Sequence, residues 1–463
     1  MSPSKPVDDA NPDASRVLAV LVGVQLPGVS EADHAADLAE LGRLVQTLGF
    51  EIAATVTQRR DSLAAAAVLG DGKLKELASL TGGRGIVPSG APEVKTKARA
   101  RWAEAQGDAD NVDESVDERE GALRPSVVVV DHEISPSQAR NLERATGARV
   151  LDRTGVIVDI FHRHARSREA RLEVEIARLN YIAPRMRESS GGKERQRGKG
   201  AGEAAIELDR RKIRDRIAEL REQLAAIQRE QENRRQARHD QLRVALVGYT
   251  NAGKSSLMRA LTGSQVLVED KLFATLDTTV RALQPETKPR VLVSDTVGFI
   301  KKLPHDLVAS FRSTLAEALE ASILLYVVDA ADPAHAAQLE VTRQVLREIG
   351  ADAVPSRLIL NKADRLDEPA RAAIFRAYAS EAPLLVSAHD PADVARVRSE
   401  ILAFFESSMV EEKLTVLYAK QGLLGEVYEN ARVIAEEYDE AGTHLTVRAL
   451  PAALARLRRA VES

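Results

Sequence analysis

The segment that most constrains the fold of this chain is residues 244–256. Four apolar residues, Val244 to Val247, predict a buried strand. The strand runs directly into the pattern Gly248-x-x-x-x-Gly253-Lys254-Ser255. Such a glycine-rich turn points backbone N–H groups at phosphate oxygens, and the helix that follows offers its positive N-terminus. In this pattern Lys254 reaches the β- and γ-phosphates and the Ser255 hydroxyl ligates Mg²⁺, so the sequence predicts a phosphate-binding strand, loop and helix.

Three further motifs follow this loop. Asp295 ends a second apolar strand and precedes Gly298, a pair that suits a water-mediated hold on Mg²⁺ and an N–H bond to the γ-phosphate. Asn361 to Asp364 follows another apolar segment, and a carboxylate at Asp364 accepts two N–H bonds that guanine can give and adenine cannot. Ser387-Ala388 then offers a backbone amide to guanine O6. The four motifs together predict a GTPase domain of the Ras-like class.

The expected GTP site therefore lies on four loops. Lys254 and Gly298 are the expected catalytic residues in them. The residues expected to contact GTP on these loops are Gly248, Tyr249, Thr250, Asn251, Ala252, Gly253, Lys254, Ser255, Ser256, Asp295, Thr296, Val297, Gly298, Asn361, Lys362, Ala363, Asp364, Ser387, Ala388 and His389.

Length and composition limit the remaining possibilities. The chain has 463 residues, enough for about three domains at roughly 100–200 residues each. Its formal net charge of −4 argues against a general polyanion binder, and the absence of cysteine excludes disulfides and thiolate metal sites. No apolar run approaches the length of a membrane span, and residues 1–15 lack the apolar core of a signal peptide. We expect a cytoplasmic monomer.

The expected fold class is α/β multidomain. After a tail at residues 1–15, residues 16–160 alternate strands and helices and predict an N-terminal α/β domain. Within this domain, residues 105–121 form an acidic insertion that we expect to be a solvated loop. The predicted elements are strands at Val17–Gln25, Phe50–Val56 and Val127–Val130, a helix at Glu31–Leu48, and a helix that begins with Ser135 at its N-cap and Pro136 at N1.

A long helical hairpin is expected at residues 161–240. An apolar stripe on its second helix, Ile213 to Ile227, faces a stripe on the first, Leu172 to Leu179. The tip, residues 188–202, is rich in glycine and charged residues. Two interpretations are open: a solvated linker, or an arm whose Arg and Lys side chains contact nucleic-acid phosphates. The candidate contacts with nucleic-acid phosphates are Arg185, Arg187, Lys193, Arg195, Arg197 and Lys199.

The last segments are a central Ras-like P-loop GTPase domain at 241–408 and a small C-terminal α+β module at 409–463. In the module, Thr415–Leu417 and Thr443–Leu450 are predicted strands, and Gly425–Tyr438 is a predicted helix between them. About 50 residues make a marginal core, so the module is expected to pack against another part of the chain or a partner.

Several of these segments resemble the HflX family of ribosome-associated GTPases, in the Obg-HflX-like branch of the P-loop GTPases. The resemblance rests on Asp152–Phe161, Gly200–Glu203, Phe273–Asp277 and Asp295–Pro304, and it continues through His305–Thr314. One departure is Gly-Ala-Gly-Glu at 200–203, where the family usually has Gly-Pro-Gly-Glu. The resemblance implies a switch I that contacts GTP through Phe273, Ala274, Thr275, Leu276 and Asp277, with Thr275 a catalytic residue and a second Mg²⁺ ligand. Thr278 and Thr279 are the competing candidates for that threonine.

The residue after Gly298 is Phe299, where Ras-like enzymes carry the glutamine that orients the attacking water. A phenyl ring cannot make that hydrogen bond, so we expect slow intrinsic hydrolysis that ribosomes stimulate. Asn251 resembles the P-loop asparagine that binds K⁺ in other GTPases lacking the glutamine. An equally weighted alternative is that Asn251 only stabilises the loop.

The resemblance implies a GTPase that binds the ribosome, mainly the 50S large subunit and its rRNA, in the GTP state, splits or rescues stalled or idle 70S particles, and leaves after hydrolysis to GDP. The alternatives are a regulatory switch that times RNA or protein binding without splitting, and a nucleotide-dependent rRNA remodeller. The family also implies ATP binding by the N-terminal domain, but no second P-loop is present and Gly70 to Lys73 is a weak glycine signal. The expected cofactors are Mg²⁺ and K⁺.

Overall fold

The computed structural model describes residues 17–87, 124–185, 201–236, 242–263, 272–273, 279–302 and 317–462. The N-terminal tail and the acidic insertion lie outside these residues. The described residues form two compact units, one ending at Ile157 and also holding the helix end at Pro184–Arg185, and one formed by the other residues from Val158 onward. Among the described residues, no helix combines the length and the apolar character needed to cross a membrane.

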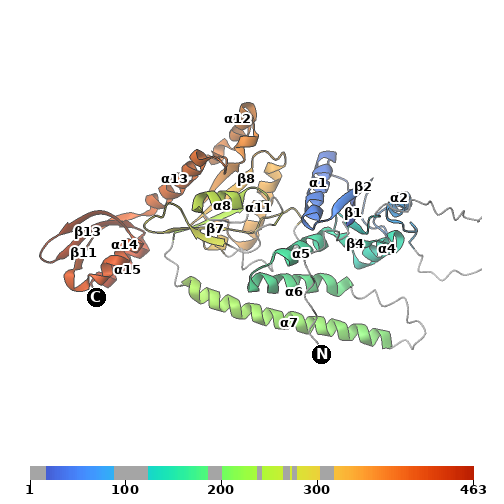
Figure 1. The fold of residues 1–463 in the computed structure, drawn as a ribbon, viewed down its shortest axis with the longest axis horizontal. Helices are drawn as coiled ribbons and strands as arrows, with labels where there is room; N and C mark the ends of the chain where they lie inside the picture. The colour runs from blue at the N-terminus through green and yellow to red at the C-terminus, as the bar shows by residue number, and fades with distance from the viewer. Residues whose placement is uncertain are drawn as a thin grey trace, which may run out of the picture. The chain divides into compact units, whose positions relative to one another are not determined.

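The first unit is a parallel four-stranded sheet with helices on both faces (Figure 1). The strand order is β2-β1-β3-β4. The order places β1 and β3 in the middle of the sheet, where their side chains are buried on both faces. The elements are β1 (Leu18–Gln25), α1 (Glu31–Thr47), β2 (Glu51–Arg59), α2 (Asp71–Thr81), β3 (Val127–Val130), α4 (Pro136–Thr146), β4 (Arg149–Asp152) and the start of α5 (Arg153–His164).

Alternation along β1 separates the two layers of helices. Val20 and Val22 belong to the apolar core that β1 shares with α2 and α4. Leu21 and Gly23 point to the opposite face, where α1 packs closely enough that a Cβ on Gly23 would lie 2.8 Å from Leu38 Cδ2. At the start of α4, Ser135 and Gln138 form a capping box, with Pro136 in the first turn. The predicted helix start is therefore confirmed, because each partner satisfies an N–H that the helix leaves open.

In the second unit, the helical hairpin follows the end of α5. Helices α6 (Arg168–Arg185, within this unit to Ala183) and α7 (Ala201–Gln236) lie side by side (Figure 1). The predicted stripes meet in one apolar cluster, and an ion pair between Glu175 and Arg216 lies beside it at 3.1 Å. The cluster comprises Leu172, Ile176, Leu179, Ile213, Ile217, Leu220, Leu224 and Ile227. Of the predicted tip, residues 188–200 lie outside the described residues, and Ala201–Gly202 begin α7.

The central domain is a six-stranded sheet with the order β10-β9-β8-β5-β7-β6. Only the pair β6 and β7 is antiparallel. Every other neighbouring pair is parallel, as in doubly wound folds. The elements are β5 (Leu242–Gly248), α8 (Lys254–Thr262), β6 (Thr279–Ala282), β7 (Val291–Asp295), β8 (Ile323–Asp329), α11 (His335–Ile349), β9 (Ser356–Asn361), α12 (Glu368–Ala377), β10 (Leu384–Leu385) and α13 (Pro391–Ser408).

Strand β5 is buried on both faces. Val244 and Leu246 pack in the core that contains the apolar faces of α8 and α13. Ala245 and Val247 pack in the core that contains Leu346 of α11. Helices on both sides hold β5 in place, so its carboxyl end, where the phosphate-binding pattern begins, is a fixed point of the fold.

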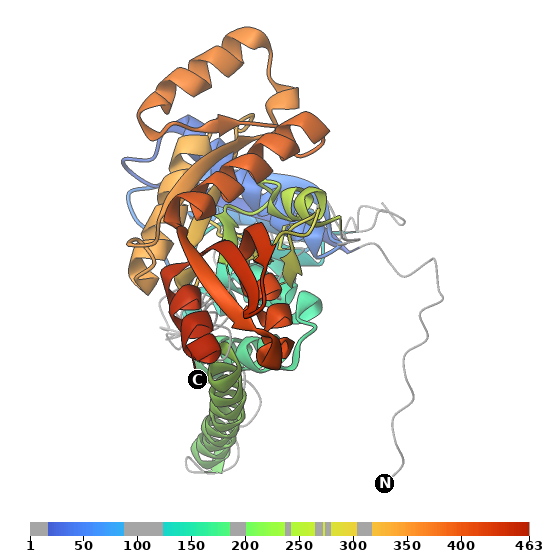
Figure 2. The ribbon, with the colours of Figure 1, turned by 90° about the vertical axis from the view of Figure 1, so that its left-hand side faces the viewer.

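The C-terminal module is an antiparallel sheet, β11-β13-β12, covered by α14 and α15 (Figure 2). The predicted helix Gly425–Tyr438 is wrong in its second half, because Arg432–Tyr438 is strand β12, paired with β13. Its Ala and Glu residues suggest a helix, but pairing along β13 overrides that weak propensity. The elements are β11 (Val410–Leu417), α14 (Gly422–Asn430), β12 (Arg432–Tyr438), β13 (Gly442–Ala449) and α15 (Pro451–Glu462).

Candidate nucleotide site

The phosphate-binding loop joins the carboxyl end of β5 to the N-terminus of α8. Gly253 is the N-cap of α8 and has a φ of +92°, in the left-handed region that favours glycine. A Cβ at this position would lie 2.1 Å from the side-chain nitrogen of Asn361. Gly253 is therefore required by both the turn and the close approach of the guanine-motif asparagine.

Lys254 is the first residue of α8, and its side chain turns back over the loop. The amine donates to the carbonyl oxygens of Gly248 at 3.1 Å and Tyr249 at 2.8 Å, and the residue is only 6% exposed. Burial lowers the pKa of Lys254 to about 8, although the nearby Asp295 carboxylate favours the charged form. The anionic phosphates of a nucleotide would favour the charged amine further.

Ser255 and Asp295 bring together the oxygens expected to hold Mg²⁺. The Ser255 hydroxyl donates to Asp295 Oδ2 at 2.6 Å, and Asp295 is fully buried at the end of β7. A hydroxyl and a carboxylate at the same point are hard oxygen donors of the kind that Mg²⁺ prefers. The residues present therefore fit a magnesium ion.

Asn361 connects three of the four predicted loops. Its side-chain nitrogen donates to the carbonyl of Ala252 in the phosphate-binding loop at 2.9 Å. Its side-chain oxygen accepts from the backbone N–H of Ala388 at 3.0 Å. Because Asn361 is 1% exposed, these two bonds are made away from water, and they hold the base-recognition loops against the phosphate loop.

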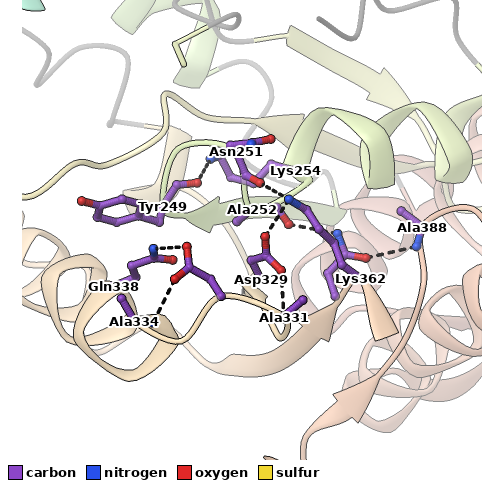
Figure 3. A network of polar contacts seen from close by, with 12 residues as sticks. Tyr249, Asn251, Ala252, Lys254, Asp329, Ala331, Ala334, Gln338, Lys362 and Ala388 are labelled. Atoms are coloured by element: carbon purple, nitrogen blue, oxygen red, sulfur yellow. Dashed lines mark hydrogen bonds and ion pairs between the residues drawn. The ribbon is translucent and has the colours of Figure 1, made fainter. Parts of the chain in front are cut away.

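Lys362 makes a second connection across the same loops (Figure 3). Its amine lies 2.7 Å from Asp329 Oδ2, at the end of β8, and 2.6 Å from the carbonyl oxygen of Asn251. Asn251 has a φ of +59°, so the bond anchors a left-handed residue of the phosphate loop. The other oxygen of Asp329 accepts from Ala331 N at 3.0 Å, which fixes the carboxylate itself.

Asp364, the expected guanine acceptor, is exposed beside these buried residues. A hydrogen bond from the Ser387 side chain holds the pKa of the Asp364 carboxyl below its ordinary value. The carboxylate is therefore ionised at neutral pH, as an acceptor of two N–H bonds must be. Ser387 is held in turn by its backbone N–H, which donates to Asp393 at 2.8 Å.

Switch I is described only in part. Residues 274–278 lie outside the described residues, and with them Ala274, Thr275, Leu276, Asp277 and the competing Thr278. Phe273 has a φ of +58° and packs edge-on against Phe161 of α5, with the ring centroids 4.6 Å apart. Thr279 begins β6. Phe273 thus makes an apolar contact that was not predicted, and its contact with GTP stays a prediction.

Phe299 lies inside the core of the domain. Its side chain is 2% exposed and packs in the same apolar cluster as Val247 and Leu346. A ring in this position does not point at the phosphate loop. The side chain therefore contributes to stability, in agreement with the expectation that it cannot orient water.

The basic tip lies almost entirely outside the described residues, including Arg187, Lys193, Arg195, Arg197 and Lys199. Arg185 is described, and its guanidinium lies 2.6 Å from Asp152 Oδ2, a side chain with no exposed surface. This ion pair gives Arg185 a partner within the protein, and the contact of all six residues with rRNA stays a prediction.

Sequence reasoning missed Asp329 and the hydroxyl of Tyr249. Asp329 ends an apolar strand, as Asp295 ends β7. This similarity could have indicated from the sequence that Asp329 lies at the nucleotide site. The Tyr249 hydroxyl accepts a hydrogen bond from Lys301 N at 2.7 Å. No spacing in the sequence indicates this contact, because it depends on how two loops lie side by side.

Family models match most of the chain. Residues 35–87 and 93–162 match the GTP-binding GTPase N-terminal family, and residues 164–238 match the GTP-binding GTPase middle region. Residues 243–362 match the family described as 50S ribosome-binding GTPase. The three matches follow one another along the chain, so they describe one multidomain arrangement.

Curated relatives extend over nearly the whole length. The chain is 67% identical over 444 residues to GTPase HflX of Gluconacetobacter diazotrophicus, covering 96% of this chain and 98% of that protein. It is 35% identical to GTPase HflX of Caldanaerobacter subterraneus, covering 92% and 89%. A solved GTP-binding protein of Sulfolobus solfataricus in complex with GDP is 21% identical, with a TM-score of 0.42 and coverage of 84% and 98%.

Proposed function

This chain belongs to the HflX family of GTPases and hydrolyses GTP, and on that premise we propose that GTP controls its attachment to the ribosome. In the GTP state the protein binds chiefly the 50S subunit and splits stalled or idle 70S particles, and hydrolysis releases it. The observation that carries the proposal is the family match of residues 243–362 to a 50S ribosome-binding GTPase, on the same segment that holds the nucleotide site.

The helical hairpin is the proposed contact with rRNA. An apolar cluster stabilises α6 against α7, and the segment between the helices carries Lys193, Arg195, Arg197 and Lys199. Cations on such an arm meet phosphates and release counterions, a contribution to binding that does not depend on base sequence. Because aromatic residues are missing from this segment, recognition would depend on backbone and shape rather than on base stacking.

The nucleotide site supplies the proposed timing. Lys254 would bind the β- and γ-phosphates, Ser255 would hold Mg²⁺ directly and Asp295 through water, and the Gly298 N–H would contact the γ-phosphate. Mg²⁺ at these oxygens would neutralise charge that develops on the phosphates during transfer. Asp364 selects guanine, and Thr275 reports the γ-phosphate from switch I.

Hydrolysis by the free protein is proposed to be slow. The buried Phe299 ring cannot place a water molecule, and no assigned arginine supplies charge at the transition state. Two supplements are proposed, a K⁺ ion at Asn251 and ordering of switch I by the large subunit. A GTPase of this kind stays in the bound state until the ribosome itself triggers release.

Ribosome sedimentation tests the proposal. Purified 70S particles are mixed with the protein and a non-hydrolysable GTP analogue, and the profile is compared with that obtained with GDP. Free subunits and co-migration of the protein with 50S in the analogue alone are the expected result. Intact 70S particles with bound protein would favour the regulatory switch, and binding to rRNA fragments without ribosomes would favour the remodeller.

A charge-matched pair of variants separates the hairpin tip from general electrostatics. Replacing Arg195, Arg197 and Lys199 with Gln is expected to weaken 50S binding and to reduce its salt slope by roughly 0.7 to 0.9 for each phosphate that is no longer neutralised. Replacing Arg43, Arg376 and Arg459, which are exposed and lie outside residues 243–362, removes the same charge and is expected to leave the slope unchanged. Equal effects of the two variants would place the anchor elsewhere.

A further inference from the structure

The phosphate loop and the segment after Asp295 lie side by side as a short parallel bridge between Tyr249 and Phe299. Thr250 N donates to Phe299 O at 2.8 Å, and Phe299 N donates to Gly248 O at 3.1 Å. A third bond extends the bridge, because Lys301 N donates to the hydroxyl of Tyr249 at 2.7 Å. Two backbone bonds and one side-chain bond thus attach residues 299–301 to the phosphate loop.

The third bond differs from the other two because it depends on a particular side chain. Any residue at position 249 would allow the backbone pairing, but only a side chain with a hydroxyl at the reach of tyrosine accepts from Lys301 N. Tyr249 is 5% exposed, so little water is available to replace that acceptor. Losing an acceptor in such a place leaves an N–H poorly satisfied, which is more costly than losing a bond at the surface.

The bridge also determines where Gly298 lies. A Cβ on Gly298 would be 2.9 Å from Thr250 Cα and 3.0 Å from Lys254 Nζ. Gly298 is therefore held beside the amine that binds the terminal phosphates. The γ-phosphate bound by Lys254 would be within reach of the Gly298 N–H only while residues 299–301 remain attached to the loop.

We propose that Tyr249 is a positioning residue for the γ-phosphate: its hydroxyl holds residues 298–301 where Gly298 can contact GTP, and it thereby contributes to the preference for GTP over GDP. Phe299 cannot take part through its side chain, which is buried in the core. The chain instead fixes this segment from the phosphate loop. The role concerns the GTP chemistry of the domain and stands whether or not the ribosomal proposal is correct.

The test is Tyr249→Phe, which keeps the ring and removes only the hydroxyl. Loss of one net hydrogen bond corresponds to a factor of about threefold to tenfold. We expect affinity for a non-hydrolysable GTP analogue to fall by that factor, affinity for GDP to stay within about twofold, and kcat to fall with the analogue affinity. GDP has no γ-phosphate, so a change confined to GTP separates positioning from a general effect on the loop.

Tyr378→Phe is the matched control. Its hydroxyl also makes a hydrogen bond within the same domain, to His335 Nδ1 at 2.8 Å, and its removal is expected to leave both affinities and kcat unchanged. Thermal unfolding of both variants checks that they fold. Equal losses of GTP-analogue and GDP affinity in Tyr249→Phe would show that the hydroxyl only supports the loop, and unchanged affinities and kcat would show that it has no role.

Discussion

The amine of Lys362 joins the base-recognition motif directly to the phosphate loop, and the carboxylate of Asp329, which belongs to neither, holds that amine in place. Its amine bonds both Asp329, at 2.7 Å, and the Asn251 carbonyl, at 2.6 Å. Lys362 and Asp329 are each less than 15% exposed at the side chain, so the ion pair is only weakly screened by solvent. The position of Asn251 therefore depends on a charge at the end of a neighbouring strand.

Asp329→Asn is expected to weaken GDP and GTP binding by about tenfold or more, the loss associated with a hydrogen bond to a charged partner. Binding of a fluorescent guanine nucleotide measures it. The matched control is Asp332→Asn, because Asp332 lies in the same loop but its oxygens accept from Ala334 N and Gln338 Nε2. Unchanged affinity in Asp329→Asn would mean that the Asn251 carbonyl alone suffices to hold Lys362.

Nucleotide affinity is expected to depend on pH above neutrality. Burial lowers the pKa of Lys254 to about 8, and bound phosphates raise it again, so the protonated amine is the form that binds. Affinity for GDP should then be nearly constant with respect to this group below about pH 7, fall about twofold between pH 7 and pH 8, and fall roughly fivefold more between pH 8 and pH 9 as the amine loses its proton.

Calorimetry in two buffers with different ionisation heats tests the same coupling between nucleotide binding and protonation of Lys254. About half a proton should be taken up on binding at pH 8, if a group of pKa near 8 becomes fully protonated in the complex. Lys254→Arg keeps its charge throughout this range, so it should lose the pH dependence whatever its affinity. An affinity of the wild-type protein that stays constant with pH, with no proton uptake, would contradict the conclusion that burial lowers the pKa of Lys254.

Asp364→Asn should shift base preference from guanine toward xanthine. The amide can donate to the xanthine oxygen that replaces the exocyclic amine of guanine, whereas the carboxylate can only accept. Competition between GTP and XTP measures the shift, with Asp367→Asn, a carboxylate that caps α12, as the control. Undiminished GTP affinity without any gain for XTP would rule out Asp364 as the base acceptor.

Turnover should respond to K⁺ and to ribosomes. We expect weak hydrolysis by the free protein, a clear rise with 50S subunits, and a smaller rise when K⁺ replaces Na⁺. Because these effects act on charge and positioning in the transition state, they should appear mainly in kcat. Asn251→Ala should remove the K⁺ response and keep the response to 50S. Fast turnover in Na⁺ without ribosomes would mean that another side chain replaces the missing glutamine.

Local patterns in the sequence predicted those parts of the fold that local interactions determine. The helix start at Ser135 and the apolar stripes of the hairpin are examples, because both depend on residues at most four positions apart. The Ras-like class followed from four motifs at the ends of strands. Strand β12 was missed because the Ala and Glu residues within it favour a helix. Its strand conformation depends on pairing with β13, which follows it in the chain.

The contacts between loops could not be predicted in the same way. The bonds of Lys362 with Asp329, of Tyr249 with Lys301, and of Asn361 with Ala252 and Ala388 all join segments distant in the chain. Motifs indicate which loops approach the nucleotide, but the contacts among them depend on the register of the sheet. Phe273 is a related case, because its contact with Phe161 comes from a helix outside the GTPase motifs.

The close approach of Gly253 to Asn361 limits which genetic changes this protein can tolerate. Any side chain at position 253 would enter the space of the Asn361 amide, and even Asn361→Asp, which keeps an acceptor for Ala388 N, would lose the N–H that donates to Ala252. A substitution at another residue cannot restore the space beside Gly253 or the N–H of Asn361. In a selection for restored function, inactive alleles at either residue should therefore yield true revertants and no second-site suppressors.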